Sequence, residues 1–187
     1  IALAGILAAM KVKKEQMTDQ VYLVHGAGAG GVGIADQIHT ELMEQGMDEK
    51  QALARIFTLD SRGVVTSDRA LEPYKEKFAK DPKTLAWLTS PEDNTLLNAI
   101  KNEGVTVLIG TSGQPGCFTK EVVLAVGENT DRPAILPLSN PTTHFVDVDN
   151  FNTKVACFLW LTCCAVNIFR YQQGCLTRNA TCNCTAL

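Results

Sequence analysis

The sequence predicts an α/β fold, a doubly wound parallel sheet with helices on both faces. Three observations predict it: four short apolar runs have the composition of buried strands, helical segments separate each run from the next, and a glycine-rich turn joins the first run to a helix. The chain has 187 residues and is 45% hydrophobic. That is enough to close one core of its own.

The predicted strands are short runs rich in β-branched or aliphatic residues. They are residues 21–25, 56–60, 105–110 and 133–138. Gly26 ends the first run, and Arg62-Gly63 after the second suits the turn of a small hairpin. Because helices separate the four runs, we expect parallel strands joined by right-handed crossovers.

The predicted helices show apolar residues at helical spacing, or capping residues at their ends. They are residues 1–10, 31–45, 47–55, 91–103 and a segment from Thr119 through Ala125. Gly46 is a C-terminal stop for the second of these. Ser90-Pro91 gives the 91–103 segment a capping hydroxyl and a first-turn proline, and two acids follow at its positive end.

Composition changes near residue 150. All 20 acidic residues lie in residues 1–150 beside 14 basic ones, a net charge of −6, whereas residues 151–187 carry +3 and six of the seven cysteines. We therefore expect a folded domain over 1–150 and an irregular or divergent Cys-rich tail over 151–187. The apolar run 155–169 is shorter than the roughly 20 residues that span a bilayer. A total charge of −3 without a basic cluster argues against a nucleic-acid partner.

Residues 26–31, GAGAGG, fit the G-x-G-x-x-G pattern between a strand and a helix. In a dinucleotide site of the Rossmann type, Gly26 would allow the tight turn, Gly28 the approach of a pyrophosphate, and Gly31 close packing of the helix. Amides at the helix start would face the phosphates. The residues involved there are Ala29, Gly30 and Val32. The alternative interpretation is a plain glycine-rich turn.

Asp60 ends the second predicted strand, where an acid bonds the adenosine ribose in such sites. The alternative is a turn or helix-capping aspartate. Ser61, Arg62 and Lys75 follow, and they could receive the 2′-phosphate of NADP or be solvated surface groups.

Metal ligands are not indicated in this chain. His25, His39 and His144 lack the spacing of a metal site, and each is expected to be structural. Cys182-x-Cys184 with Cys175 lacks the paired C-x-x-C spacing of a zinc site.

Several longer stretches resemble the malic enzymes, the decarboxylating malate dehydrogenases. They are IALAGILAAMKV, GAGAGGVGIADQI, LDSRGVV, TVLIGTSGQPGCFT and ILPLSNPT, in family order over residues 1 to about 143. The resemblance implies an NAD(P)-binding Rossmann-type domain, from an enzyme that converts L-malate to pyruvate and CO2 with NAD or NADP and Mg²⁺ or Mn²⁺. It also implies a homo-oligomer, a dimer or tetramer.

Functional residues follow from the resemblance position by position. Gly26, Gly28 and Gly31 match the pyrophosphate loop, and Asp60 matches the acid after the second strand. Ser112 and Gly113 match the loop beside the cofactor, and Asn140 matches an Asn that contacts the substrate carboxylate near the nicotinamide ribose. The family's catalytic Tyr and Lys and its metal-binding acids precede the segment that begins at Ile1. We therefore expect a fragment that has no catalytic residue and is inactive alone.

Several points stay open in the sequence. Ser61 and the YKEKF segment with Lys75 resemble the NADP-using members of the family and favour NADP slightly as the cofactor. Residues 151–187 are either divergent native sequence or an out-of-frame translation. The other functional hypotheses are a different Rossmann dehydrogenase, such as one acting on amino acids, and a non-catalytic protein that binds partners through its tail. The compartment is also left open, between the cytoplasm and a mitochondrion-type organelle.

Overall fold

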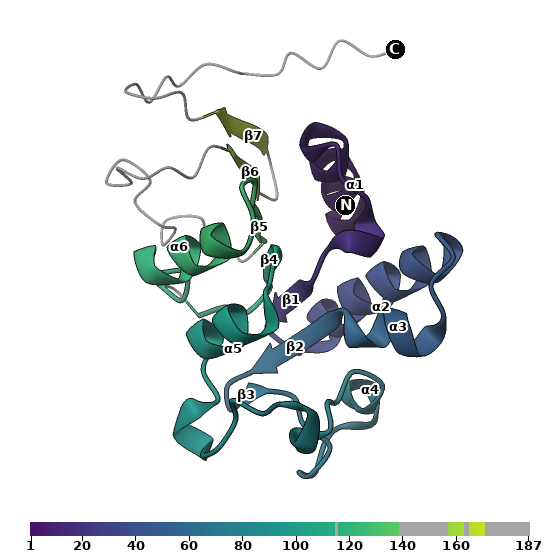
Figure 1. Ribbon diagram of the computed structural model, residues 1–187, viewed down its shortest axis with the longest axis vertical. Helices are drawn as coiled ribbons and strands as arrows, with labels where there is room; N and C mark the ends of the chain where they lie inside the picture. The colour runs from purple at the N-terminus through teal and green to yellow at the C-terminus, as the bar shows by residue number, and fades with distance from the viewer. Residues whose placement is uncertain (115, 139–156, 163–164, 171–187) are drawn as a thin grey trace.

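The computed structural model describes residues 1–114 and 116–138, and the backbone of residues 157–162 and 165–170 (Figure 1). Its helices are α1 (Ala2–Lys13), α2 (Ala29–Glu44), α3 (Glu49–Ala54), α4 (Pro73–Glu76), α5 (Leu96–Glu103) and α6 (Lys120–Asn129). Its strands are β1 (Tyr22–His25), β2 (Ile56–Asp60), β3 (Gly63–Val64), β4 (Val107–Gly110), β5 (Ala134–Pro137), β6 (Cys157–Thr162) and β7 (Ala165–Arg170). Three short 3₁₀ turns cover Met17–Asp19, Pro82–Thr84 and Pro91–Asp93.

All seven strands form one sheet, in the order β3-β2-β1-β4-β5-β6-β7. The central strands β2, β1, β4, β5 and β6 run parallel to one another. The edge strand β3 is antiparallel to β2, and the edge strand β7 is antiparallel to β6. From β1 the chain first winds outwards to β2 and then returns to place β4 on the other side of β1. This reversal confirms the predicted doubly wound sheet. It also opens a crevice at the carboxyl ends of β1 and β4, where ligands bind in this class of fold.

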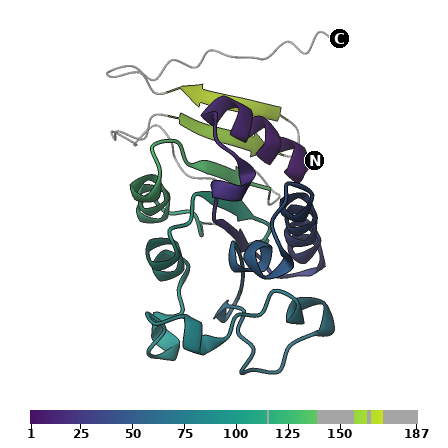
Figure 2. The ribbon, with the colours of Figure 1, turned by 45° about the vertical axis from the view of Figure 1, so that its right-hand side comes forward.

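Alternate side chains of the strands enter two separate cores. Tyr22 and Val24 of β1 pack with α1 and α2, while Leu23 packs with α5 and α6. The two helix layers lie on opposite sides of the sheet in both views (Figures 1 and 2). β1, β4 and β5 are buried on both faces, as their apolar composition predicts. Packing on both faces holds these strands in place beneath the loops at their carboxyl ends.

The predicted helix over residues 91–103 is wrong in its first part. Ser90-Pro91 does begin a turn, but it is a 3₁₀ turn, and α5 starts only after a second cap, the Thr95 side chain, which accepts from the N–H of Asn98. Asn94 interrupts the helix because its Oδ1 accepts from the N–H of Val64, 2.7 Å away on β3. A contact with a distant strand thus overrides the local capping signal.

Other boundaries shift by a few residues. The helix predicted over residues 31–45 begins earlier, at Ala29, and the one predicted to run through Ala125 ends at Asn129. Residues 151–187 have no predicted element, but the structure places β6 and β7 there. Asn140, His144 and the rest of the tail lie outside the described residues. In the part of the chain that is described, no helix has the length and apolar character needed to cross a membrane.

Candidate functional site

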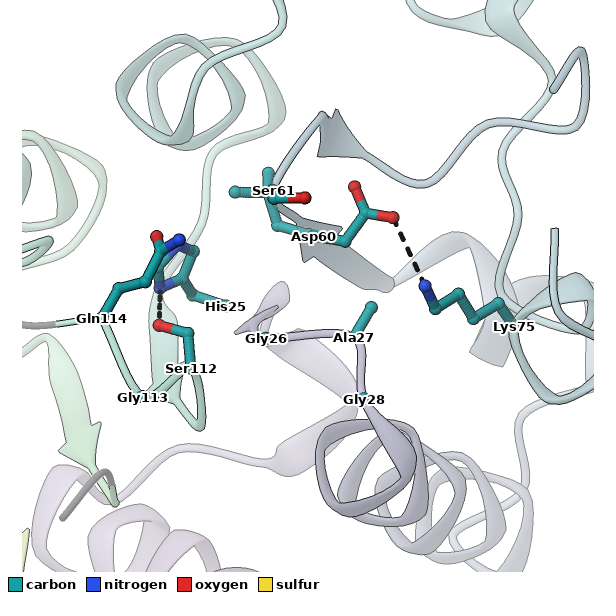
Figure 3. Close-up of a pocket in the computed structure, with 11 residues that line it drawn as sticks. His25, Gly26, Ala27, Gly28, Asp60, Ser61, Lys75, Ser112, Gly113 and Gln114 are labelled. Carbon is teal, nitrogen blue, oxygen red and sulfur yellow. Dashed lines mark hydrogen bonds and ion pairs between the residues drawn. The ribbon is translucent and has the colours of Figure 1, made fainter. Parts of the chain in front are cut away.

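A pocket of about 280 Å³ lies at the carboxyl ends of β1, β2 and β4 (Figure 3). Strand register brings its parts level, because His25 of β1 pairs with Leu59 of β2 and with Gly110 of β4. The lining residues come from the three strand ends, from the loops that follow them and from α4. They are His25, Gly26, Ala27, Gly28, Leu59, Asp60, Ser61, Lys75, Ser112, Gly113 and Gln114.

The turn after β1 requires two of its glycines. Gly26 has a φ of +119°, and a Cβ there would lie 2.5 Å from the backbone nitrogen of Ser112. A Cβ on Gly31 would lie 1.9 Å from the carbonyl oxygen of Gly26. Both positions therefore exclude larger residues, one because of the turn and one because α2 packs directly on it. These are the roles that the glycine spacing predicts.

The start of α2 is open towards the pocket. Gly28 is its N-cap residue and has no side chain that could cap the helix. A Cβ on Gly28 or on Gly30 would have no other atom within 4 Å. The first turn of this helix contains no acidic residue. Unpaired amide groups and the positive end of the helix dipole face the same space. Such an end binds phosphate and other anions.

Asp60 lies at the end of β2, on the pocket wall, and its side chain is only 12% exposed. Its Oδ1 accepts from the backbone N–H of Arg62 at 2.9 Å and from Arg69 Nη2 at 3.1 Å. The Lys75 ammonium lies 3.5 Å from Oδ2. Burial alone would raise the pKa of Asp60, but these hydrogen bonds and charges together lower it. The carboxylate is therefore ionised at neutral pH and fixed in orientation.

Lys75 is held by two carboxylates. Besides Asp60, it pairs with Glu72 at 2.9 Å, and the bond to Glu72 raises the pKa of this lysine. The residue as a whole is 8% exposed. Its charge is thus matched within the protein.

His25 lines the pocket, although the sequence analysis does not predict it as a site residue. Its Nδ1 lies 3.0 Å from Ser112 Oγ, and Ser112 is 87 positions away along the chain. Burial lowers the pKa of His25, so the ring is neutral at pH 7. The prediction that it is structural omits this contact with the pocket wall. The available signal is its position directly before the first glycine of the turn.

The structure brings most of the predicted site residues together. Those that line the pocket are Gly26, Gly28, Asp60, Ser61, Lys75, Ser112 and Gly113. Gly31 and Val32 are buried under the turn, while Ala29 and Gly30 are exposed at the helix start. Arg62 is exposed and contacts Asp60 only through its backbone N–H. Asn140 lies outside the described residues.

Metal-binding side chains do not gather in this site. Within residues 1–114 and 116–138, no three His, Cys, Asp or Glu side chains come close enough to hold a metal ion. The acid nearest the pocket, Asp60, already pairs with two cations.

Comparison with known proteins decides the family. The family model for the malic enzyme NAD-binding domain matches residues 1–150. The chain belongs to the malic enzyme family. The resemblance of the sequence to the malic enzymes is thereby confirmed, as is the Rossmann-type fold. These malic enzyme matches do not favour an amino-acid dehydrogenase or a non-catalytic interaction protein.

Curated relatives in the malic enzyme family carry two activity names. A malolactic enzyme of Lactococcus lactis is 41% identical over 143 residues, and an NAD-dependent malic enzyme of Acinetobacter baylyi is 38% identical over 145 residues. Both matches cover 76% of this chain. The chain spans only 26% of the length of either relative.

A solved structure supports the fold independently. The crystal structure of an NAD-dependent malic enzyme from Thermotoga maritima matches with a TM-score of 0.57. The match covers 85% of this chain and 37% of that one, at 20% sequence identity. At that identity the likeness concerns the fold of the malic enzyme domain.

Proposed function

We propose that this chain is the NAD-binding part of an enzyme that converts L-malate to pyruvate and CO2. The observation that carries the proposal is the open N-terminus of α2, with the ionised Asp60 carboxylate on the opposite wall of one pocket. That arrangement suits a dinucleotide, which has a diphosphate at its centre and ribose hydroxyls beside it. Bound NAD would supply a hydride acceptor for C2 of malate.

The pocket residues have separate roles in this proposal. Backbone amides from Gly28 to Gly30 hold the diphosphate, and the Asp60 carboxylate accepts hydrogen bonds from the adenosine ribose. Ser112 and Gly113 form the wall along the rest of the nucleotide. Asn140 contacts the substrate carboxylate near the nicotinamide ribose. Each residue orients a group of the cofactor or substrate, and none is proposed to transfer a proton.

NAD, rather than NADP, is the cofactor that we propose. In the sequence, Ser61 and Lys75 favour NADP as the cofactor. However, the Lys75 ammonium is paired with both Glu72 and Asp60, so its charge is already compensated before any phosphate arrives. The Asp60 carboxylate would also repel a 2′-phosphate. Relatives named NAD-dependent malic enzymes agree with this choice.

The remaining parts of the reaction belong to the complete enzyme. We propose that it uses Mg²⁺ or Mn²⁺ and forms a homodimer or homotetramer. The described residues offer no group of three His, Cys, Asp or Glu side chains that could hold such an ion. The chain alone should bind NAD without oxidising malate.

A second candidate reaction comes from the relatives named malolactic enzymes, which suggest lactate as the product instead of pyruvate. Incubating the complete enzyme with malate, NAD and Mn²⁺ separates the two. Equal amounts of NADH and pyruvate support the proposed reaction. Lactate without accumulated NADH supports the malolactic one, and faster oxidation of an amino acid than of malate would reject both.

A further inference from the structure

His25 lies where strand β1 meets the loop after β4. Side-chain alternation places it on the α5 and α6 face of the sheet, with Leu23, and it is 8% exposed. Its ring lies beside the Phe118 ring, with centroids 6.1 Å apart. Phe118 in turn packs on Gly110, where a Cβ would lie 2.8 Å from Cζ of the ring. The imidazole is therefore enclosed by the segment that joins β4 to α6.

Ser112 is held twice by this one residue. Its N–H donates to the carbonyl oxygen of His25 at 3.0 Å, and its Oγ lies 3.0 Å from Nδ1 of the ring. The carbonyl of His25 also accepts the N–H of Thr111 at 2.8 Å. Backbone bonds alone would fix the path of the loop. The bond to the imidazole additionally fixes the side chain of Ser112.

The segment that His25 holds is one wall of the nucleotide pocket. Figure 3 shows Ser112, Gly113 and Gln114 on the same side as His25, with Asp60 and Lys75 across from them. Gly113 and Gln114 are exposed, and a Cβ on Gly113 would meet no neighbouring atom within 4 Å. Their placement therefore depends on what anchors the start of the loop.

We propose that His25 is a positioning residue for the nucleotide, which acts by fixing the side chain of Ser112 on the wall that receives NAD. This inference rests on the proposed function and deepens it. His25 acts through Ser112 and through no contact of its own with the reacting atoms. The neutral ring offers Ser112 a donor or an acceptor at Nδ1, according to tautomer, and the Ser112 hydroxyl can take the complementary role.

The His25 ring makes this contact in its neutral form at pH 7. Burial lowers the pKa of His25, and no charged neighbour contributes to that shift. The charged groups that line the pocket with it are Asp60, whose pKa is lowered, and Lys75, whose pKa is raised. Both keep their charge from about pH 5 to about pH 8, so His25 is the pocket side chain that titrates below neutrality.

Calorimetric titration of NAD into the 187-residue chain tests this inference, with four variants: His25→Phe, His25→Asn, Ser112→Ala and the His25→Phe/Ser112→Ala double variant. His25→Phe and Ser112→Ala should each weaken NAD binding by about threefold to tenfold, the usual range for one lost hydrogen bond. The double variant should lose no more than the larger of the two single losses, because both substitutions remove the contact between His25 and Ser112. His25→Asn, which places an amide near Nδ1, should stay within about twofold of the unmodified chain.

His39 supplies a matched control, because it is also buried, at 5% exposed, but packs against Phe78 away from the pocket. His39→Phe should change thermal stability and leave NAD affinity unchanged.

The outcomes distinguish failure of the role of His25 from failure of the proposed function. Unchanged NAD affinity in His25→Phe and Ser112→Ala, or losses that add in the double variant, would overturn the role of His25 while NAD binding by the unmodified chain keeps the proposed function. No NAD binding by the folded, unmodified chain would overturn both. Circular dichroism of every variant shows that it is folded.

Discussion

The Lys75 ammonium lies 3.5 Å from Oδ2 of Asp60, at the edge of the pocket between β1 and β2. Arg69 pairs with the other oxygen, so the carboxylate is oriented from both sides before a ligand enters. Holding a charged group in place this way reduces the entropy lost when it binds a ribose. Asp60 is thus preorganised for the nucleotide.

Replacing Asp60 should weaken NAD binding strongly. Asp60→Ala removes a charged hydrogen-bond acceptor, and the expected loss is about 10-fold to 100-fold in the dissociation constant for NAD. NADP should lose less, because the repulsion of its 2′-phosphate disappears at the same time. Fluorescence or calorimetric titration with both nucleotides measures this.

The control for this substitution is Asp36→Ala. Asp36 also pairs with a lysine, Lys77, but it lies on the exposed surface of α2 outside the pocket. NAD affinity should not change in Asp36→Ala. Equal affinity of NAD in Asp60→Ala and in the unmodified chain would contradict the assigned role of Asp60.

Alanine substitutions at two glycines of the turn should have different effects, one on stability and the other on NAD binding. Gly31→Ala places a Cβ against the carbonyl of Gly26, and should lower the free energy of unfolding by about 1–3 kcal/mol. Gly28→Ala meets no protein atom, and should change it by less than about 0.5 kcal/mol. Gly28→Ala should nevertheless weaken NAD binding, because the new methyl group lies where the diphosphate approaches. Urea unfolding and nucleotide titration on the same samples separate the two effects.

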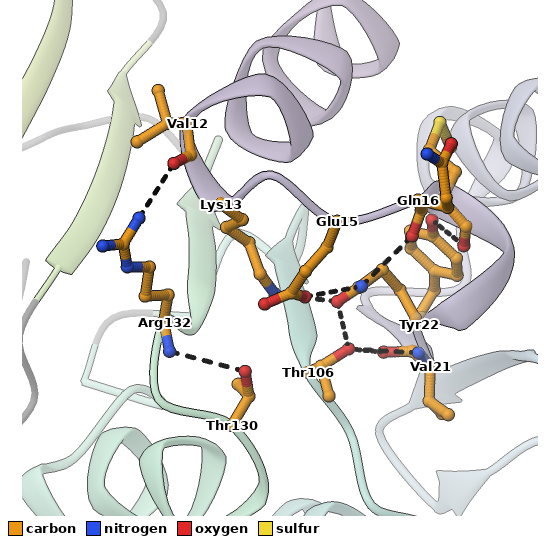
Figure 4. Close-up of polar contacts among 11 residues, drawn as sticks. Val12, Lys13, Glu15, Gln16, Val21, Tyr22, Thr106, Thr130 and Arg132 are labelled. Carbon is orange, nitrogen blue, oxygen red and sulfur yellow. Dashed lines mark hydrogen bonds and ion pairs between the residues drawn. The ribbon is translucent and has the colours of Figure 1, made fainter.

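A partly buried polar network ties α1 to the amino ends of β1 and β4 (Figure 4). Thr106 Oγ1 donates to Gln20 Oε1 at 2.9 Å and accepts the N–H of Val21 at 3.1 Å. Lys13 donates to the same Gln20 oxygen at 2.7 Å. The network lies at the opposite end of the strands from the pocket.

Thr106→Val should therefore reduce stability without affecting NAD. It removes the partner of the Val21 N–H and one partner of Gln20, at a cost of about 1–3 kcal/mol in the free energy of unfolding. Thr40→Val, on the exposed side of α2, is the matched control and should cost less than about 0.5 kcal/mol. Chemical denaturation gives both values, and equal losses would count against the network.

Lys80 should make stability depend on pH in the alkaline range. Its ammonium lies over the Phe57 ring, 4.2 Å from the centroid, and donates to the carbonyl of Leu53. Burial lowers its pKa to about 8, below the ordinary 10.5. Between these values the unfolded chain binds more protons than the folded one, so the free energy of unfolding rises with pH. The free energy of unfolding of Lys80→Met, measured by urea titration, should rise less steeply over this pH range than that of the unmodified chain. Parallel curves for the two proteins would contradict the shifted pKa.

Local patterns predicted the architecture because its elements are set by nearby residues. The buried run before Gly26, the glycine spacing and the acid at Asp60 all depend on short-range chemistry, and the structure brings Gly26, Gly28 and Asp60 together around one pocket. Thr119 was likewise predicted as a cap, and its side chain accepts from the N–H of Val122.

Contacts between distant segments account for what the sequence did not reveal. Asn94 interrupts a well-capped helix only because β3 lies beside it. The role of His25 appears only when strand register brings Ser112 next to it. Its position before Gly26 places His25 at the end of β1, but it does not reveal that a loop 87 positions away lies beside the ring.

The most direct test of the central claim is a titration of NAD into the isotopically labelled chain, followed by its backbone amide resonances. If the start of α2 holds the diphosphate, the signals of Gly28, Ala29 and Gly30 should shift together and saturate with one dissociation constant, and those of Ser112 and Gly113 should follow the same curve. Unchanged signals at Gly28–Gly30 with the chain folded, or shifts confined to residues outside the pocket, would contradict the account.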